Sequence, residues 1–345
     1  MLKEVVNQKI ISYIFSKFPQ GIAEVLTDAH LIIPYYHMIN DGPVNHIKHL
    51  YVHKGVRQFV EDLDFLLRHY KPISLFDLLD CFNNRGTLPN RAFLLTFDDG
   101  FREMHDIVAS ILLNKGIPAT FFVNSSFVDN KNLCYEHKAS ILVDKVKGIN
   151  SIDIRREIGK ILASKKNVDA SNLERGILSV PYKKRKLLDE IATIMNTDFN
   201  EYLSRNKPYL TSNQIRELIK SGFSIGAHSI DHPYYSALTL EEQLTQTLEC
   251  VNFVRHNFKL DYGAFAFPHH DNFVSKKYYS KVFDSGLVDI SFGTGGMKED
   301  VINWNLQRIN FETPLMPAKR ILALEHARKI YKTIRGTNKI RRPET

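Results

Sequence analysis

A chain of 345 residues that is 43% hydrophobic and 24% charged has the composition of an ordinary globular protein, long enough for one α/β domain with insertions or for two smaller domains. Its formal charge of +8 is compatible with an anionic partner such as a lipid surface, an acidic glycan or a nucleotide-linked sugar, but a solvated basic surface explains the charge more simply. No basic–aromatic motif predicts a nucleic-acid partner. The three cysteines, Cys81, Cys134 and Cys250, are too few and too widely spaced for a disulfide framework, and the lack of a C-x-x-C pair argues against a thiolate zinc site.

The N-terminal segment, residues 1–30, is predicted to be amphipathic and helical, because residues 5–15 carry apolar side chains at helical spacing. Charged residues interrupt the segment, and it lacks the unbroken apolar core and cleavage site of a signal peptide. No stretch of the chain resembles an uncharged membrane span. We expect the segment to pack on the domain or else to lie on a membrane surface. The expected location is cytoplasmic, with or without peripheral contact with the inner face of a membrane.

Residues 31–128 alternate between apolar runs and segments with apolar residues at helical spacing. Ser74 is a candidate helix N-cap. A strand, a helix and a strand at this spacing form a βαβ unit with parallel strands. The expected elements are strands over 31–37, 93–97 and 119–123, and helices over 56–70, 75–79 and 107–113.

Residues 129–208 are rich in Lys, Arg, Asn and Asp, but apolar positions persist, so we predict a helical insertion rather than disorder. The alternation resumes at Thr211, which opens a helix with capping-box spacing. This pattern predicts a parallel barrel over 31–315 and a C-terminal helix and tail over 316–345, with functional groups at the carboxyl ends of the strands. The remaining expected elements are strands over 223–226, 262–267, 285–291 and 307–311, and helices over 211–222, 240–258 and 317–335.

Two neighbouring carboxylates, Asp98 and Asp99, end the apolar run 93–97 and are followed by Gly100. Adjacent side chains point in different directions, so one carboxylate can bind a metal ion while the other faces a water molecule that the ion activates. An Asp-Asp-Gly sequence by itself is more often a plain turn. The pair becomes informative only together with a second motif.

Two histidines, His228 and His232, follow a second apolar run. Residues four apart on one helical turn face the same way, and two imidazoles with one carboxylate leave open positions on a metal ion. Zinc is the expected ion, and iron, cobalt, manganese or nickel also suit these ligand types. Their spacing is not diagnostic, since His49 and His53 share it. What distinguishes His228 and His232 is their position at a strand end.

With these two motifs the chain resembles the polysaccharide deacetylases, the carbohydrate esterase family 4 or NodB-homology proteins. The sequence T-F-D-D-G over 96–100 matches the first motif of that family, and H-S-I-D-H over 228–232 matches its second motif, H-[ST]-x-x-H. The run G-I-P-A-T-F-F-V over 116–123 is also typical of the family. The early pair Tyr36-His37 resembles the sequence at this point in the branch of the family that acts on exported glucosamine polymers. The resemblance covers about residues 31–311. It implies a distorted parallel (β/α) barrel of the NodB-homology type with a helical insertion.

The resemblance also implies a function, namely hydrolysis of an N-acetyl, sometimes an O-acetyl, group on a polysaccharide or glycan precursor. Carried over by motif, Asp98 is the expected general base, and Asp99, His228 and His232 are the expected ligands of a divalent metal, most simply Zn²⁺. In the family reaction, metal-activated water attacks the acetyl carbonyl, and the metal and a backbone N–H near the first motif stabilise the oxyanion. The expected partner is an acetylated glycan or sugar precursor. No oligomeric state is predicted.

The chain departs from the family pattern at the arginine of the third motif, which orients the base. The matching stretch, residues 265–271, contains no arginine. Arg308, at the end of a late expected strand, is our candidate replacement, and the alternative for this residue is a surface salt bridge.

The histidine that protonates the leaving amine is also displaced. Leu324-Glu325-His326 matches the fifth family motif, L-x-H, in letters but falls in an expected helix. His269 or His270 can act as the acid or contact the sugar, and His37 can line the pocket or pack as a structural residue. Two further residues are candidates for contact with substrate, namely Pro268 at the rim and Trp304 as a sugar platform or a core residue.

These departures keep two other functions open. One is a catalytically impaired homologue that binds glycans or serves as a scaffold. The other is a metal-dependent amidohydrolase of a small molecule. The intact Asp98 and both histidines argue against an impaired site.

Overall fold

The computed structural model describes residues 27, 29–164, 172–313 and 316–345. The amphipathic segment expected over residues 1–30 therefore lies almost wholly outside the described residues. Among the helices that are described, none is both long and apolar enough to cross a lipid bilayer.

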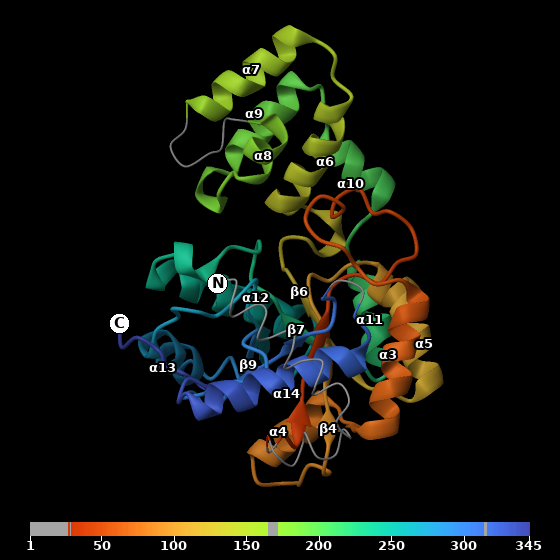
Figure 1. Ribbon diagram of the computed structural model, residues 1–345, viewed down its shortest axis with the longest axis vertical. Coiled ribbons are helices and arrows are strands. Elements are labelled where there is room, and N and C mark those ends of the chain that lie inside the picture. Colours follow the sequence, from red (N-terminus) through yellow and green to blue (C-terminus); the bar gives the residue numbers. More distant parts are fainter. Residues whose placement is uncertain (1–26, 28, 165–171, 314–315) are drawn as a thin grey trace.

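A parallel barrel forms the centre of the fold (Figure 1). Its neighbouring strands are, in order, β2 (Pro34–Tyr36), β5 (Leu95–Phe97), β6 (Ala119–Val123), β7 (Ser224–Ala227), β8 (Ala264–Ala266) and β9 (Ile290–Gly293). The last segment is split at Arg308 into β11 (Asn305–Gln307), which pairs with β9, and β12 (Ile309–Asn310), which pairs with β2. Because these halves are the two edges of the sheet, one segment closes it. The predicted distorted (β/α) barrel is confirmed.

Two expected strands are divided rather than continuous. The run 31–37 forms β1 (Leu31–Ile32) and β2, and the run 93–97 forms β4 (Ala92–Phe93) and β5. In a separate small sheet, β1 and β3 (Lys71–Pro72) both pair with β4. A buried cluster joins alternate strand residues such as Leu94, Phe122 and Phe292 to α4 (Leu75–Phe82). Alternate residues fill a small barrel, so this cluster packs its interior.

The helices outside the barrel begin at capping residues that the sequence displays. Ser74, Thr211 and Thr239 each form a capping box at the start of α4, α11 (Ser212–Lys220) and α12 (Leu240–Phe258). The helix expected over 107–113 is α5 (Ala109–Lys115), preceded by a π-helical turn over Met104–Val108. The expected helices over 56–70 and 317–335 are α3 (Val56–His69) and α14 (Ala318–Ile334).

One helix and several short strands were not predicted. The unpredicted helix, α13 (Lys276–Asp284), buries Tyr278, Tyr279 and Val282, and β9 begins only at Ile290, five residues later than the expected strand over 285–291. Near the C-terminus, β13 (Lys339–Ile340) pairs with β10 (Glu299–Asp300).

Among the described residues of the segment 129–208, which lies between β6 and β7, there are five α-helices. In Figure 1 most of this helical insertion forms a layer above one end of the barrel, opposite α4. Its first helix packs against the third and fourth through buried residues such as Leu142, Ile177 and Leu188. The helices are α6 (Tyr135–Lys147), α7 (Ile152–Ala163), α8 (Leu173–Leu178), α9 (Lys186–Ile194) and α10 (Phe199–Asn206).

Candidate active site

The two sequence motifs meet at one rim of the barrel. Asp98 directly follows β5 and its N–H donates to the Tyr36 carbonyl, and His228 directly follows β7 and its N–H donates to the Val123 carbonyl. Both residues thus extend the strand ladders by one bond, and only β6 separates their strands. The chain then turns sharply after Asp98, because Asp99 and Gly100 adopt φ values of 69° and 64°. A side chain at Gly100 would approach Val123 Cγ1 to 3.0 Å, so glycine fits this turn.

The two histidines are not brought together by a helical turn, as the sequence analysis expected. Residues 228–232 are non-helical, and Ser229 and His232 adopt left-handed φ values of 73° and 63°. The Ser229 hydroxyl accepts a hydrogen bond from the His232 N–H (3.0 Å), and the Asn124 amide donates to the carbonyl of His228. These bonds hold a compact loop in which the two imidazole centres are 5.2 Å apart.

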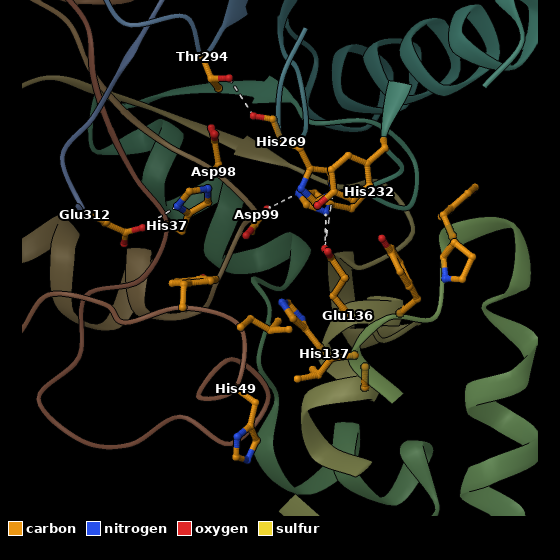
Figure 2. A pocket seen from close by; sticks show the side chains of 18 of the residues that line it. His37, His49, Asp98, Asp99, Glu136, His137, His232, His269, Thr294 and Glu312 are labelled. Atoms are coloured by element: carbon orange, nitrogen blue, oxygen red, sulfur yellow. Dashed lines mark hydrogen bonds and ion pairs between the residues drawn. The ribbon is translucent and has the colours of Figure 1, made fainter. Parts of the chain in front are cut away.

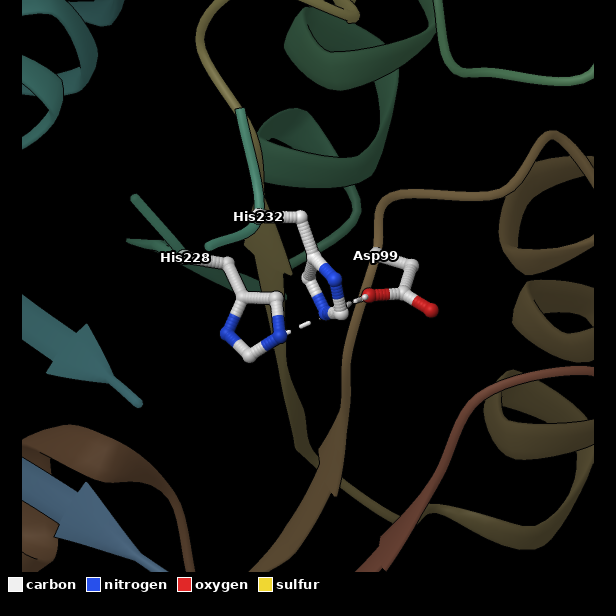
Figure 3. Close-up of side chains that lie close together, drawn as sticks. All are labelled: Asp99, His228 and His232. Atoms are coloured by element: carbon white, nitrogen blue, oxygen red, sulfur yellow. Dashed lines mark ion pairs between the residues drawn. The ribbon is translucent and has the colours of Figure 1, made fainter. Parts of the chain in front are cut away.

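The Asp99 carboxylate and the two imidazoles converge on one point (Figure 3). Asp99 Oδ1 lies 3.4 Å from His228 Nε2 and 3.2 Å from His232 Nε2. All three residues are buried. His228 Nδ1 lies 2.8 Å from the Ala266 carbonyl, so it donates there and leaves Nε2 as the lone-pair nitrogen.

This donor set fits a divalent metal ion. Asp99 Oδ1 is buried and has no hydrogen-bond partner among the described residues, which is costly unless a cation satisfies it. The ligand atoms lie within 4.8 Å of one another, and one carboxylate with two imidazoles is a common ligand set for catalytic zinc. Burial opposes ionisation of Asp99, but the adjacent His232 and His228 hold its pKa well below the usual value. Asp99, His228 and His232 are therefore the residues that would bind the ion.

The neighbouring carboxylate, Asp98, is bound on both oxygens by Arg308. The guanidinium donates to Asp98 Oδ1 at 2.6 Å and to Oδ2 at 2.7 Å, and the Arg308 side chain is fully buried. It also donates to the Thr96 hydroxyl (3.3 Å) and lies over the Tyr35 ring. Burial alone would raise the pKa of Asp98, but the charge of Arg308 and its hydrogen bonds hold it below its usual value. Asp98 is thus ionised, oriented and 4.0 Å from His228 Nε2.

A second charged pair faces the same site. His37 follows β2, and its Nδ1 lies 2.6 Å from Glu312 Oε2, while Glu312 Oε1 accepts the Met38 N–H at 2.7 Å. Burial lowers the pKa of His37, but the Glu312 carboxylate, together with smaller contributions from Asp99 and Asp98, more than offsets this and raises it to about 9. His37 is therefore protonated at neutral pH. Glu312 was missed in the sequence, although it follows a strand end like Arg308.

These groups line a cavity of about 1100 Å³ between the barrel and the insertion (Figure 2). The barrel supplies Asp98, Asp99, His37 and His232, which lie together at one side. No lysine or arginine occurs among the described residues that line it. The insertion contributes Tyr135, Glu136, His137, Leu178, Pro181 and Tyr182.

The remaining candidate pocket residues are distributed differently. His269 lines the cavity and stacks on Tyr234 with ring centres 3.5 Å apart. Burial and the neighbouring His232 hold the pKa of His269 well below its usual value, so this imidazole is neutral. Pro268 is buried and does not line the cavity, because the chain bends after β8 and only His269, in a left-handed conformation with φ of 53°, reaches it. Arg308 does not line it either, since it lies behind Asp98.

Two further sequence hypotheses are corrected by the structure. His326 is buried on α14, where its Nδ1 bonds to the Thr27 hydroxyl at 2.8 Å, and it does not line the cavity. Because His326 lies on this helix, it is not at a strand end, and its match to the L-x-H motif placed it wrongly at the active site. Trp304 packs on Phe82 and lines a different cavity, so it is not a sugar platform beside Asp98.

Comparison with known proteins identifies the family. A profile described as polysaccharide deacetylase matches residues 85–282, more than half of the chain. The chain belongs to the polysaccharide deacetylase family. As a polysaccharide deacetylase, it is a hydrolase of non-peptide carbon–nitrogen bonds whose substrates are acetylated glycans. No curated protein sequence matches the chain.

Solved structures share the fold of this deacetylase at low sequence identity. The Streptococcus pyogenes deacetylase PplD, in complex with acetate, is 13% identical, with a TM-score of 0.53 over 85% of this chain and 97% of that chain. IcaB from Ammonifex degensii is 15% identical, with a TM-score of 0.52 over 86% and 97%. A de-N-acetylase from Aggregatibacter actinomycetemcomitans is 14% identical, with a TM-score of 0.51 over 84% and 99%.

Proposed function

We propose that this polysaccharide deacetylase is metal-dependent and hydrolyses the N-acetyl group of an amino sugar in a glycan or glycan precursor. The observation that carries the proposal is the division of labour between adjacent carboxylates. Asp99 lies with His228 and His232 in a set of metal-binding donors, whereas Asp98 is held by Arg308 at hydrogen-bond distance on both oxygens.

Asp98 is the proposed general base. The bidentate Arg308 contact keeps it ionised and fixes its plane, so it can accept a proton from the water molecule that adds to the acetyl carbonyl carbon. A divalent ion bound by Asp99, His228 and His232 would polarise that carbonyl and make the water more acidic. Glu312 and Arg308 supply the charges that set the protonation states of the two reacting groups.

His37 is the proposed general acid. Its pKa of about 9 keeps it protonated at neutral pH, and it faces the cavity from the strand next to Asp98. When the carbon–nitrogen bond breaks, the nitrogen takes the proton of His37, which yields acetate and a free amine. The neutral His269 and the distant His326 are poorer donors.

The test is acetate release by the full chain, stripped with a chelator and reloaded with Zn²⁺. The substrates are acetylated oligosaccharides, nucleotide sugars and lipid-linked sugars, and the readouts are acetate and new primary amine. We expect equal amounts of both from at least one substrate, and loss of both in the stripped protein. Acetate without amine would indicate O-deacetylation, and no acetate from any substrate would favour the binding or scaffolding alternative.

A further inference from the structure

One carboxylate in the cavity comes from the helical insertion rather than from the barrel. Glu136 lies in the first turn of α6, two residues after the N-cap Cys134, and its side chain points at the catalytic rim (Figure 2). Its Oε2 atom lies 3.4 Å from His232 Nδ1 and 3.6 Å from His269 Nε2. Through this contact the insertion reaches a proposed metal ligand.

The two histidines of the second motif are supported differently. His228 donates its Nδ1–H to the Ala266 carbonyl of β8, so the barrel itself fixes the orientation of this ring. His232 sits in a left-handed loop conformation, and its Nδ1 is buried with no hydrogen-bond partner among the described residues. Metal-binding histidines usually donate the second ring N–H to a carboxylate or carbonyl, which fixes the tautomer and the ring plane. The group placed to accept this N–H belongs to Glu136.

We propose that Glu136 is the positioning residue of His232 and that it links metal binding to docking of the helical insertion on the barrel. This inference rests on the proposed function, because it takes His232 as a metal ligand. At 3.4 Å the distance between His232 Nδ1 and Glu136 Oε2 is slightly longer than a normal N–H···O bond.

The link between the two events is reciprocal. If a docked Glu136 strengthens metal binding by some factor, a bound metal strengthens docking by the same factor. The insertion also supplies one wall of the cavity, including Tyr135, Leu178 and Tyr182. Metal binding then completes the substrate cavity as well as the catalytic centre.

The thiol of Cys134, also from the insertion, lies close enough to compete for the His232 N–H. Cys134 Sγ is within 4.8 Å of the facing atoms of His232 and Glu136. A thiol is a weak acceptor, whereas a carboxylate gives a charge-assisted bond, so Glu136 is the stronger partner. Cys134→Ala therefore belongs in the test.

The first experiment measures Zn²⁺ affinity by competition with a chromophoric chelator, together with the visible spectrum of the Co²⁺-loaded protein. For Glu136→Ala we expect affinity about 10- to 100-fold weaker and an altered Co²⁺ spectrum. Glu136→Gln should lose less, because its amide oxygen still accepts the N–H. The matched control is Glu174→Gln, a partly exposed carboxylate of α8 that pairs with Lys147 and lies outside the cavity, and it should match wild type.

The second experiment measures amide hydrogen exchange in α6 and α8 with and without Zn²⁺. We expect the metal to slow exchange in the wild-type insertion and to have much less effect in Glu136→Ala. Thermal unfolding establishes that each variant folds, and Glu136→Gln serves if the alanine variant does not.

The outcomes separate the two proposals. If wild type binds Zn²⁺ and His228→Ala does not, but Glu136→Ala binds as tightly as wild type, the positioning role is wrong and the proposed function stands. The role is also wrong if Cys134→Ala weakens binding as much as Glu136→Ala. If wild type itself binds no metal, both proposals fail.

Discussion

Arg308 lies in the segment that closes the barrel, and its guanidinium donates hydrogen bonds to both carboxylate oxygens of Asp98, at 2.6 and 2.7 Å. The strand break at Arg308 is where pairing passes from β9 to β2, and the buried guanidinium lies among Thr96, Tyr35 and Asp98. The closing strand of the fold thus carries the counter-ion of the proposed base.

Asp98→Asn should remove the base but keep the metal. Loss of a general base costs about 10²- to 10⁴-fold in turnover, so kcat should fall by that amount while Zn²⁺ affinity stays near wild type. Removing one partner of a buried ion pair also costs about 3–5 kcal/mol of unfolding free energy, so thermal unfolding should be measured alongside. Wild-type turnover in a folded Asp98→Asn protein would contradict the assignment.

Arg308→Met should shift the acid limb of the pH–rate profile. Arg308 lowers the pKa of Asp98, and burial, which raises it, would remain in the variant. The pKa of Asp98 should therefore rise, the ionised base should form only at higher pH, and the acid limb of kcat/KM should move to higher pH. Arg308→Lys, which keeps one charge but loses the bidentate contact, should shift less. An unmoved acid limb in both variants would contradict the role of Arg308.

Glu312→Gln should shift the opposite limb. Glu312 is the main group that raises the pKa of His37 to about 9, and without its charge the opposing effect of burial lowers the pKa. The proposed acid would then lose its proton at lower pH, so the basic limb should move to lower pH and activity at pH 8 should fall more than at pH 6. His37→Ala should lower kcat at all pH values. A basic limb that stays in place in Glu312→Gln would exclude His37 as the acid.

His228→Ala should abolish tight metal binding, since it removes one of three protein ligands. His53→Ala is the matched control, because His53 belongs to the other pair of histidines four residues apart and does not line the cavity. Bound zinc per chain after gel filtration distinguishes the two variants. Equal metal content in both would place the metal elsewhere.

His326→Leu should change stability and not catalysis. Burial lowers the pKa of His326 to about 4, below its usual 6.5, so the neutral form contributes stability that is present above pH 6.5 and lost as the pH falls from 6.5 towards 4. Wild type should therefore lose unfolding free energy over this range more steeply than the variant. kcat and KM should match wild type at neutral pH, and a large fall in kcat alone would return His326 to the candidate acids.

Much of this architecture is predictable because strand ends of a parallel barrel share one rim. The apolar runs that end at Asp98 and His228 could be placed together without knowing any contact, and Arg308 belonged to the last expected strand of the same barrel. The prediction of a helical turn between His228 and His232 was wrong. Ser229 and His232 adopt left-handed φ values, and neither residue type indicates this conformation in the sequence.

The contact of the helical insertion with the candidate metal site could not be predicted from the sequence. Glu136 reaches His232 only because α6 packs above the rim, and nothing in its neighbourhood distinguishes it from other surface glutamates. The hypothesis that His326 lies at the active site was wrong for a related reason. A short sequence motif does not indicate whether it lies on a helix or at a strand end.

The split strand at Arg308 sets a condition on synthesis and turnover of the enzyme. A ribosome that has made Asp98 must add 210 further residues before the counter-ion of that carboxylate exists. A polypeptide that ended before that point would lack the strand that pairs with both β9 and β2 and the guanidinium that neutralises Asp98. Fragments of this deacetylase that end before Arg308 should therefore be inactive and less stable than the full chain.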